Sequence, residues 1–320
     1  MMLKVLFASA AVCVALTSFA QAADMQPVLK APAAVDQQAT GYVEVYTGWA
    51  GTKATNDGFS TRFDGWPVGG AGRGNYWVSR DMSVQVDAQA EGTSYDFPDG
   101  GHFSTHSYLA GGHWSWRNPQ QYLFGLFGGV GDAGGAGILF SSQRHGLIGA
   151  EAQWYWQQFT LYVQGGYDTT LGSVALQQVD SINAWFLRGT GRYYVNPNFL
   201  IEGTVTYANG NIDLNFGDPS IGFQTWTWGV KGEWRFATAP FSVFAKYQGS
   251  ETKYDNAEDF FGAKVTDHRV LLGLKLHMGD RTLQQTDRAG ATLDIVSPLA
   301  NPTSPLMFSP NAGPVQALTQ

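Results

Sequence analysis

MSVQVDAQAEG, at residues 82–92, alternates polar and apolar side chains along its whole length. Gln85 and Asp87 fall on one face of this stretch, and Val84 and Val86 fall on the other. Successive side chains of a β-strand point to opposite faces, whereas a helix would scatter the polar ones around its circumference. The stretch therefore predicts a β-strand with one polar and one apolar face.

The same two-residue period recurs throughout residues 41–278. Short turns alternate with longer connections, and this alternation is typical of outer-membrane barrels. We predict an all-β fold, a closed antiparallel transmembrane β-barrel of about 12 strands with short periplasmic turns and longer extracellular loops. The predicted strands cover 41–51, 66–78, 82–95, 102–116, 121–131, 143–156, 159–168, 180–194, 198–209, 221–236, 240–252 and 265–278. The predicted loops cover 52–65, 96–101, 132–142, 169–179, 210–220 and 253–264.

The two ends of the chain differ from this central region in composition. Residues 1–22 combine an apolar run with a small-residue site at Ala22, which predicts a secretory signal peptide cleaved near that residue. The single cysteine, Cys13, lies in this segment, so we expect no disulfide in the mature chain. Residues 23–40 are predicted to form an Ala/Pro-rich linker, and residues 279–320 a Pro-rich, disordered tail.

An aromatic residue precedes each predicted short turn, at spacings of 39, 40, 38 and 40 residues. A shared position in the hairpin would place these rings in one interfacial girdle, where the ring lies in lipid and its polar atom reaches water. A soluble β-propeller or sandwich also repeats aromatic residues, but the mid-strand charges of the opposite face argue against a second buried face. The predicted girdle residues are Trp77, Trp116, Trp156, Tyr194 and Trp234.

Strand parity assigns a set of charged side chains to the polar, luminal face. Acids dominate the first half of the chain and bases the second, so closure of the barrel would create a transverse field that orients polar solutes. The alternative is a structural salt-bridge network, with Glu202 between Arg188 and Arg192 on one neighbouring strand and Lys231 and Arg235 on the other. A barrel of about twelve strands leaves a narrow pore at most. The predicted pore-lining charges are Glu44, Arg73, Asp87, Glu91, Glu151, Arg188, Arg192, Glu202, Lys231, Glu233, Arg235, Lys246, Arg269 and Lys275.

Two His-x-Ser pairs, His102 with Ser104 and His113 with Ser115, place an imidazole and a hydroxyl on one strand face, as in barrel-borne lipid hydrolases. Neither pair has an evident orienting Asp or Asn on a neighbouring strand, so we predict that the protein is not an enzyme. The histidines lack metal-ligand spacing and the glycine-rich stretches lack GK[ST], so we predict no metal and no cofactor. A net charge of −7 argues against nucleic-acid binding.

The signal peptide is followed directly by ADMQPVLKAP, at residues 23–32. This opening resembles that of alphaproteobacterial outer-membrane β-barrel proteins, a porin-like family. The resemblance covers residues 1–35 by motif and residues 41–278 by architecture only, and it implies porin-like or surface-structural roles. One departure is that such barrels usually end on an aromatic residue at the chain terminus, whereas here the last predicted strand ends at Met278.

We therefore predict a narrow, passive, porin-like channel for small hydrophilic solutes in the outer membrane of a Gram-negative cell. One alternative is a non-conducting structural or adhesive surface barrel that acts through its extracellular loops. A weaker alternative is an outer-membrane lipid hydrolase. The expected partners are outer-membrane lipid and lipopolysaccharide and the barrel-assembly machinery.

Overall fold

The computed structural model divides the chain into two units, Met1–Ala34 and Val35–Gln320. The first unit, which holds the predicted signal peptide, lies outside the described residues. The structure describes residues 38–56, 59–96, 101–136, 143–171, 179–214, 220–255 and 264–299.

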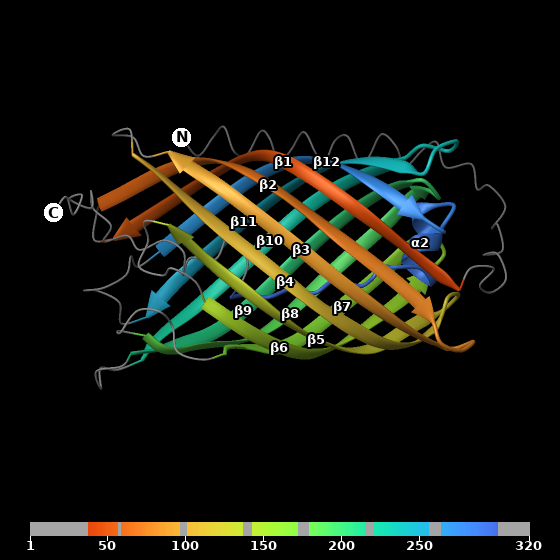
Figure 1. Cartoon of the computed structure of the whole chain (residues 1–320), viewed down its shortest axis with the longest axis horizontal. Coiled ribbons are helices and arrows are strands. Elements are labelled where there is room, and N and C mark those ends of the chain that lie inside the picture. Colours follow the sequence, from red (N-terminus) through yellow and green to blue (C-terminus); the bar gives the residue numbers. More distant parts are fainter. Residues whose placement is uncertain are drawn as a thin grey trace. The chain divides into compact units, whose positions relative to one another are not determined.

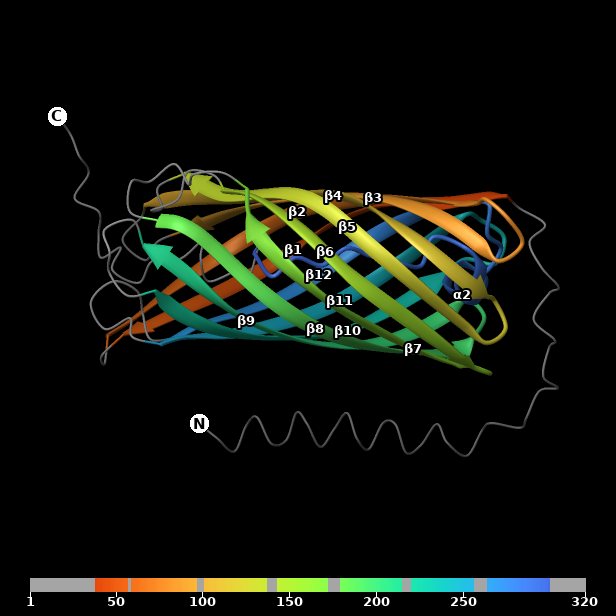
Figure 2. The same cartoon turned by 90° about the horizontal axis from the view of Figure 1, so that it is seen from below.

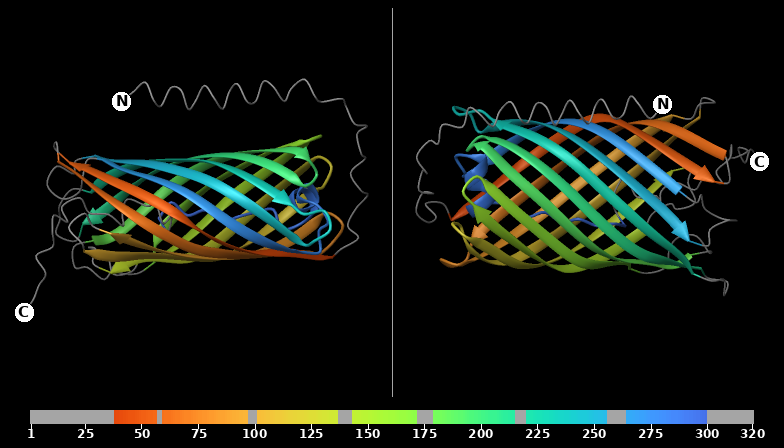
Figure 3. Two further views of the ribbon diagram at one scale, coloured as in Figure 1. Left: turned by 90° about the horizontal axis from the view of Figure 1, so that it is seen from above. Right: turned by 180° about the vertical axis from the view of Figure 1, so that it is seen from behind.

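The described strands close into a twelve-stranded antiparallel barrel in which each strand pairs with its sequence neighbours and the last pairs with the first. Closure leaves no free sheet edge, as a sheet that crosses lipid requires. The predicted fold class is confirmed, and Figures 1 and 3 show the tilt of the strands around the barrel. The strands are β1 (Ala39–Asn56), β2 (Phe59–Trp77), β3 (Met82–Asp96), β4 (His102–Asn118), β5 (Tyr122–Ala136), β6 (Gln143–Trp156), β7 (Phe159–Thr170), β8 (Val179–Asn196), β9 (Phe199–Leu214), β10 (Ile221–Arg235), β11 (Phe241–Asp255) and β12 (Lys264–Met278).

The two ends of the barrel differ in their connections. At the end that we call the turn end, short connections join the even-numbered strands to the strands that follow them. At the opposite end, the loop end, the strands extend further than the sequence predicts. β1 and β2 stay paired as far as Asn56 and Phe59. The predicted loop at 52–65 is therefore wrong for the residues described there, because the alternation continues through them.

The outer face is apolar from the turn end through the middle of the barrel. Val86, Leu126, Ile148 and Leu272 are 58–70% exposed there, and each is flanked in its strand by inward-facing neighbours. Large apolar side chains on the outside of a closed barrel are stable in contact with lipid, not water. This face therefore forms the membrane-contacting belt.

The polarity of the two faces reverses at the loop end, although the parity of the strands does not change. Exposed Arg62, Asp64 and Lys253 point outward there. The inward side chains are apolar, and they form one buried cluster that we call the distal apolar layer. Strands of 12 to 19 residues exceed the roughly 10 that cross a bilayer, so the loop end projects beyond the membrane. The layer comprises Ala50, Ala54, Phe63, Tyr95, Phe103, Ala133, Ile182, Ala184, Ile212, Ile221, Phe223, Tyr254, Val265 and Leu299.

After β12 the chain turns back into the barrel. Gly279 has a φ of 96°, in the left-handed region that favours glycine. Helix α2 (Leu283–Ala289) begins at its N-cap Thr282 and lies at the turn end (Figure 1). The chain then runs extended through the lumen toward the loop end (Figure 2). We call residues 279–299 the luminal segment.

The luminal segment differs from the disordered tail that the sequence predicts. Residues 279–299 form a helix and a buried extended chain, so the expectation of disorder is wrong for them. Residues 300–320 lie outside the described residues. Among the described residues, no helix is long and apolar enough to cross a bilayer.

Candidate functional site: the lumen and its C-terminal segment

Four apolar side chains of the luminal segment occupy separate apolar sites on the barrel wall. Leu283 packs with Tyr194 and Leu200. Leu293, Ile295 and Leu299 alternate along the extended part, and they enter three further clusters of wall residues, the last of which is the distal apolar layer. Each fully buried aliphatic side chain stabilises by about 1.5–3 kcal/mol. The segment is therefore held along its whole length.

Hydrogen bonds from the wall satisfy the backbone where α2 ends. The Trp77 indole Nε1 donates to the Ala289 carbonyl over 2.8 Å. Arg117 Nη1 donates to the Gly290 carbonyl over 2.9 Å. The last carbonyls of a helix lack partners within the helix, and these two side chains supply them. The end of α2 is thereby fixed to β2 and β4.

Asp287 joins α2 to the basic wall of the barrel. One carboxylate oxygen accepts from Arg192 Nη1 at 2.5 Å, and the other accepts from Thr160 Oγ1 at 2.6 Å. Arg192 also pairs with Glu202 through Nε at 2.9 Å. Buried charges are stable only where ion pairs and hydrogen bonds replace water. A change that removes one partner leaves the other buried and uncompensated.

Two glutamines and an arginine bind the extended part of the segment. Gln85 forms a reciprocal pair with Leu293, with Nε2 donating to the Leu293 carbonyl over 2.7 Å and Oε1 accepting from the Leu293 amide over 3.2 Å. Gln164 Nε2 donates to the Asp294 carbonyl over 2.7 Å. The Asp294 carboxylate pairs with Arg188 at 2.8 Å. Side chains of the wall thus bind both the backbone of the segment and the carboxylate of Asp294.

A last polar contact lies beside the distal apolar layer. Asp168 accepts from Ser297 Oγ, and the Leu299 amide lies 3.5 Å from the same carboxylate oxygen. His145 Nδ1 lies 2.9 Å from the other Asp168 oxygen. Asp168 is completely buried, so these contacts replace its lost hydration.

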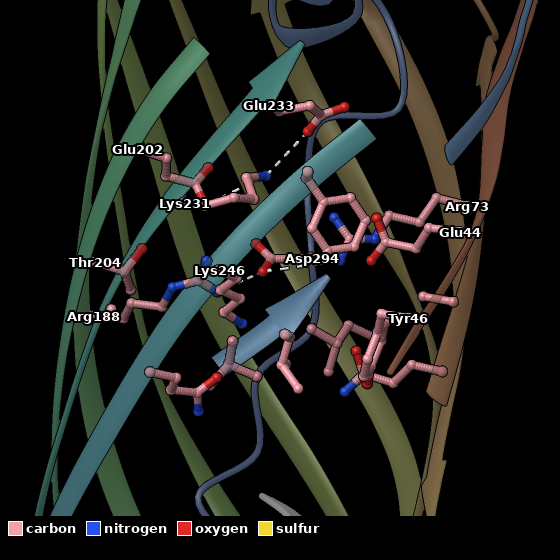
Figure 4. A pocket seen from close by; sticks show the side chains of 18 of the residues that line it. Glu44, Tyr46, Arg73, Arg188, Glu202, Thr204, Lys231, Glu233, Lys246 and Asp294 are labelled. Carbon is pink, nitrogen blue, oxygen red and sulfur yellow. Dashed lines mark ion pairs between the residues drawn. The ribbon is translucent and has the colours of Figure 1, made fainter. Parts of the chain in front are cut away.

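A cavity of about 280 Å³ remains beside the luminal segment, chiefly against β8–β12, β1 and β2. Figure 4 shows charged side chains from these strands, with Asp294 of the segment among them. Seven cationic and six anionic side chains line the cavity. A charged, partly open lumen therefore lies on one side of the segment, and a hydrogen-bonded contact lies on the other.

All fourteen charges that parity assigned to the lumen lie on inward-facing positions. Their partners differ from those expected. Glu202 pairs with Arg192 and, at 3.5 Å, with Lys231, but Arg188 pairs with Asp294 and Arg235 donates to the Asp280 carbonyl. Acids of the luminal segment thus neutralise part of the basic wall. Whether these charges line a conducting pore stays a prediction.

The predicted girdle is wrong at two of its five positions. Trp116, Trp156 and Trp234 are 46–59% exposed on the outer face, as predicted. Trp77 and Tyr194 are only 3% and 1% exposed, because they point inward and contact the luminal segment. The short turns differ in length, and a shift of one residue moves a side chain to the other face. At the turn end of those two strands, the outward aromatic residues are Tyr76 and Tyr193.

The two His-x-Ser pairs show no bond between histidine and serine in the part of the chain that is described. His102, largely exposed, pairs with Asp96. His113 is bonded through both ring nitrogens, to Glu151 at 2.8 Å and to Asp87 at 3.2 Å. An imidazole held between two carboxylates has no nitrogen left to activate a hydroxyl. Among the described residues, no group of three or more His, Cys, Asp and Glu has the arrangement of a metal site.

No family model and no curated protein matches the sequence. Among solved structures, the COG4313 outer membrane channel from Pseudomonas putida F1 is similar, with a TM-score of 0.56 and 11% identity over 78% of this chain and 100% of that chain. The chain has the fold of an outer-membrane β-barrel. The translocator domain of autotransporter NalP from Neisseria meningitidis is also similar, with a TM-score of 0.48 and 8% identity over 83% of this chain and 98% of that chain.

This fold and the apolar belt support a location in the outer membrane. The predicted cleavage near Ala22 lies outside the described residues, and the resemblance to alphaproteobacterial barrels stays a prediction. The sequence did carry signals for the luminal segment. Thr282 and Gln285 have the spacing of a capping box, and Leu293, Ile295 and Leu299 keep the two-residue period of a strand.

Proposed function

We propose that the protein is an outer-membrane channel for small hydrophilic solutes that its own luminal segment holds closed. The observation that carries this proposal is the position of the segment between a polar wall and a charged cavity of about 280 Å³. Solutes would pass on the cavity side, where side chains from β8–β12 offer both charge signs. Shape and charge at such a constriction set the selectivity of a pore.

The contacts of the segment favour a removable closure. Beside its four buried apolar side chains, the segment is held by hydrogen bonds and ion pairs, including those of Asp287 and Asp294. Such contacts exchange with water more readily than an apolar core does, because a released polar group regains its hydration. Among the described residues the segment is linked covalently to the barrel at β12, so it can leave the lumen without disturbing the strand order.

A non-conducting barrel is the second candidate, and the distal apolar layer favours it. The layer includes residues of ten strands and of the luminal segment in one buried cluster. A continuous apolar layer across a lumen excludes water and ions. Conduction requires that this layer open together with the segment.

Single-channel recording of the full-length protein in a planar bilayer tests the two candidates. Asp287→Arg sets a cation against Arg192 and should expel the segment, so we expect discrete conductance steps far more often than in the unchanged protein. Asp81→Arg makes the same charge change at an exposed turn residue and should behave like the unchanged protein. Correctly folded, heat-modifiable protein that stays silent in both variants would establish the non-conducting barrel.

A further inference from the structure

Lys246 differs from every other charged residue that lines the cavity. It extends inward from β11 into the cavity (Figure 4). Each of the six carboxylates of the lining forms an ion pair, and so does each of the six other cations. Lys246 forms no ion pair and no hydrogen bond with any residue that the structure describes. Lys246 is therefore the one cation of the lining that has no ion-pair partner among the described residues.

The position of Lys246 in the sheet increases the cost of that charge. It lies directly opposite Lys231 in the β10–β11 pairing, and like charges at opposed positions repel each other. Lys231 is stabilised by Glu202 and Glu233, at 3.5 Å and 3.4 Å. Lys246 has no carboxylate of a described residue within ion-pair distance. An anion in the cavity would supply a partner.

Uncharged polar groups line the same cavity, two to four residues closer to the loop end than Lys246. Thr206 and Thr227 lie opposite each other on β9 and β10, and Gln248 follows Lys246 on the inward face of β11. No described residue hydrogen-bonds to the side chains of these three residues. They offer two hydroxyls and one amide, which can donate to and accept from hydroxyl groups of a ligand.

We infer that the wall around Lys246 binds a small organic monoanion that carries hydroxyl groups, such as a sugar acid or a hydroxy acid. Lys246 would bind the carboxylate, and Thr206, Thr227 and Gln248 would bind the hydroxyls. One unmatched cation matches one negative charge, and the cavity of about 280 Å³ is of the size that takes a small metabolite. The inference rests on the proposed function in that it names the class of solute that the channel passes.

The binding test uses gluconate, with acetate and sorbitol as matched probes that lack its hydroxyls or its charge. Calorimetric titration of the full-length protein in detergent at low salt should show gluconate binding that is stronger than that of either partial probe. Lys246→Gln should weaken gluconate binding at least tenfold. Lys253→Gln removes a lysine from the outer face of the same strand, where Lys253 pairs with Glu251, and should leave binding unchanged.

The same titration on Asp287→Arg controls for access to the cavity, because the inferred site lies on the wall and not on the luminal segment. Absence of gluconate binding in both the unchanged protein and Asp287→Arg overturns the inference, as does binding that Lys246→Gln leaves intact. Bilayer recording separates this failure from that of the proposed function. Gluconate binding without conductance refutes the proposed channel but supports the binding site. Conductance with a gluconate permeability that Lys246→Gln leaves unchanged supports the channel but refutes the site.

Discussion

Titration of Asp280, at the start of the luminal segment, is coupled to docking of that segment. Asp280 follows β12, is 5% exposed, and lies near Arg235 and Arg117. Burial raises the pKa of Asp280 to about 6 from an ordinary value of 3.8, although the two guanidinium groups oppose this shift. The docked state therefore favours the protonated acid. Its stabilisation is complete below about pH 4 and is lost as the pH rises through about 6.

Docking of α2 should consequently weaken between pH 4 and pH 7. The thiol of Ala291→Cys reports docking, because Ala291 is 1% exposed. Its modification by a methanethiosulfonate, normalised to that of Ser79→Cys at an exposed turn, should accelerate by up to about a hundredfold over this range, since one pKa unit is a tenfold change. Asp280→Asn should flatten the profile. An equally flat profile without that substitution would contradict the assignment.

At the residue scale, the sequence predicted the face to which a side chain points better than the residue with which it pairs. Parity placed the inward charges correctly, because the side-chain period of a strand is two. It could not pair Arg188 with Asp294, since that contact crosses the lumen from a segment more than a hundred residues away. Trp77 and Tyr194 were predicted to face outward but face inward, for a similar reason. Their faces depend on turn geometry and on a segment that was not predicted to be there.

At the scale of elements, the extended part of the luminal segment depends on its reciprocal pair with Gln85. Gln85→Leu would leave the Leu293 amide and carbonyl buried without these partners, and each unsatisfied group costs about 1–3 kcal/mol. We expect thiol modification of Ala291→Cys to accelerate roughly thirtyfold or more, for a loss of about 2 kcal/mol. Gln89→Leu makes the same change on the same face of β3, at a residue without a bond to the segment, and should have little effect. Equal rates in the two variants would show that the Gln85 pair does not hold the segment.

The strands were predictable and the luminal segment was not, for one physical reason. Each strand repeats a lipid-facing apolar row, so its signal is strong and long. The segment is short, and five prolines between residues 298 and 314 dominate the composition of residues 279–320. Its capping box and its alternating Leu293, Ile295 and Leu299 occupy fewer than twenty residues. The proline-rich composition of residues 279–320 as a whole therefore outweighs the capping box and the short alternating pattern, which are evident only within residues 282–299.

The strand ends were misjudged because the polarity of the faces reverses where the barrel leaves the membrane. At the turn end, the chain changes direction at Gly279, where it leaves β12 and enters the lumen. A glycine is needed there because a φ of 96° strains any residue with a Cβ. Gly279→Val should therefore favour the undocked segment and raise the frequency of conductance steps in bilayer recordings. A closed channel with unchanged thiol modification of Ala291→Cys would show that the turn tolerates the substitution.

At the scale of the whole molecule, two aromatic belts mark the limits of the membrane. Trp234 belongs to the belt at the turn end, and Trp226, 50% exposed and in contact with Tyr207, belongs to the belt nearer the loop end. Eight residue steps separate the two tryptophans on β10, about 27 Å along a tilted strand. At a strand tilt of about 40° this length corresponds to a height of about 21 Å, which approaches the apolar band of roughly 25 Å that outer-membrane barrels present. The strand beyond Trp226 therefore lies in water.

This division of the barrel predicts unequal losses of stability when arginine is introduced at two positions of one strand. Val230 and Gln224 both point outward from β10, on opposite sides of Trp226, and Val230 is 56% exposed. Val230→Arg places a charge in lipid and should lower the free energy of unfolding by about 2–4 kcal/mol in lipid vesicles. Gln224→Arg exchanges one solvated side chain for another and should change it by less than about 0.5 kcal/mol. Equal losses would move the membrane boundary past Gln224 and make the distal apolar layer part of the transmembrane barrel, whereas the expected difference confines that layer to the portion outside the bilayer.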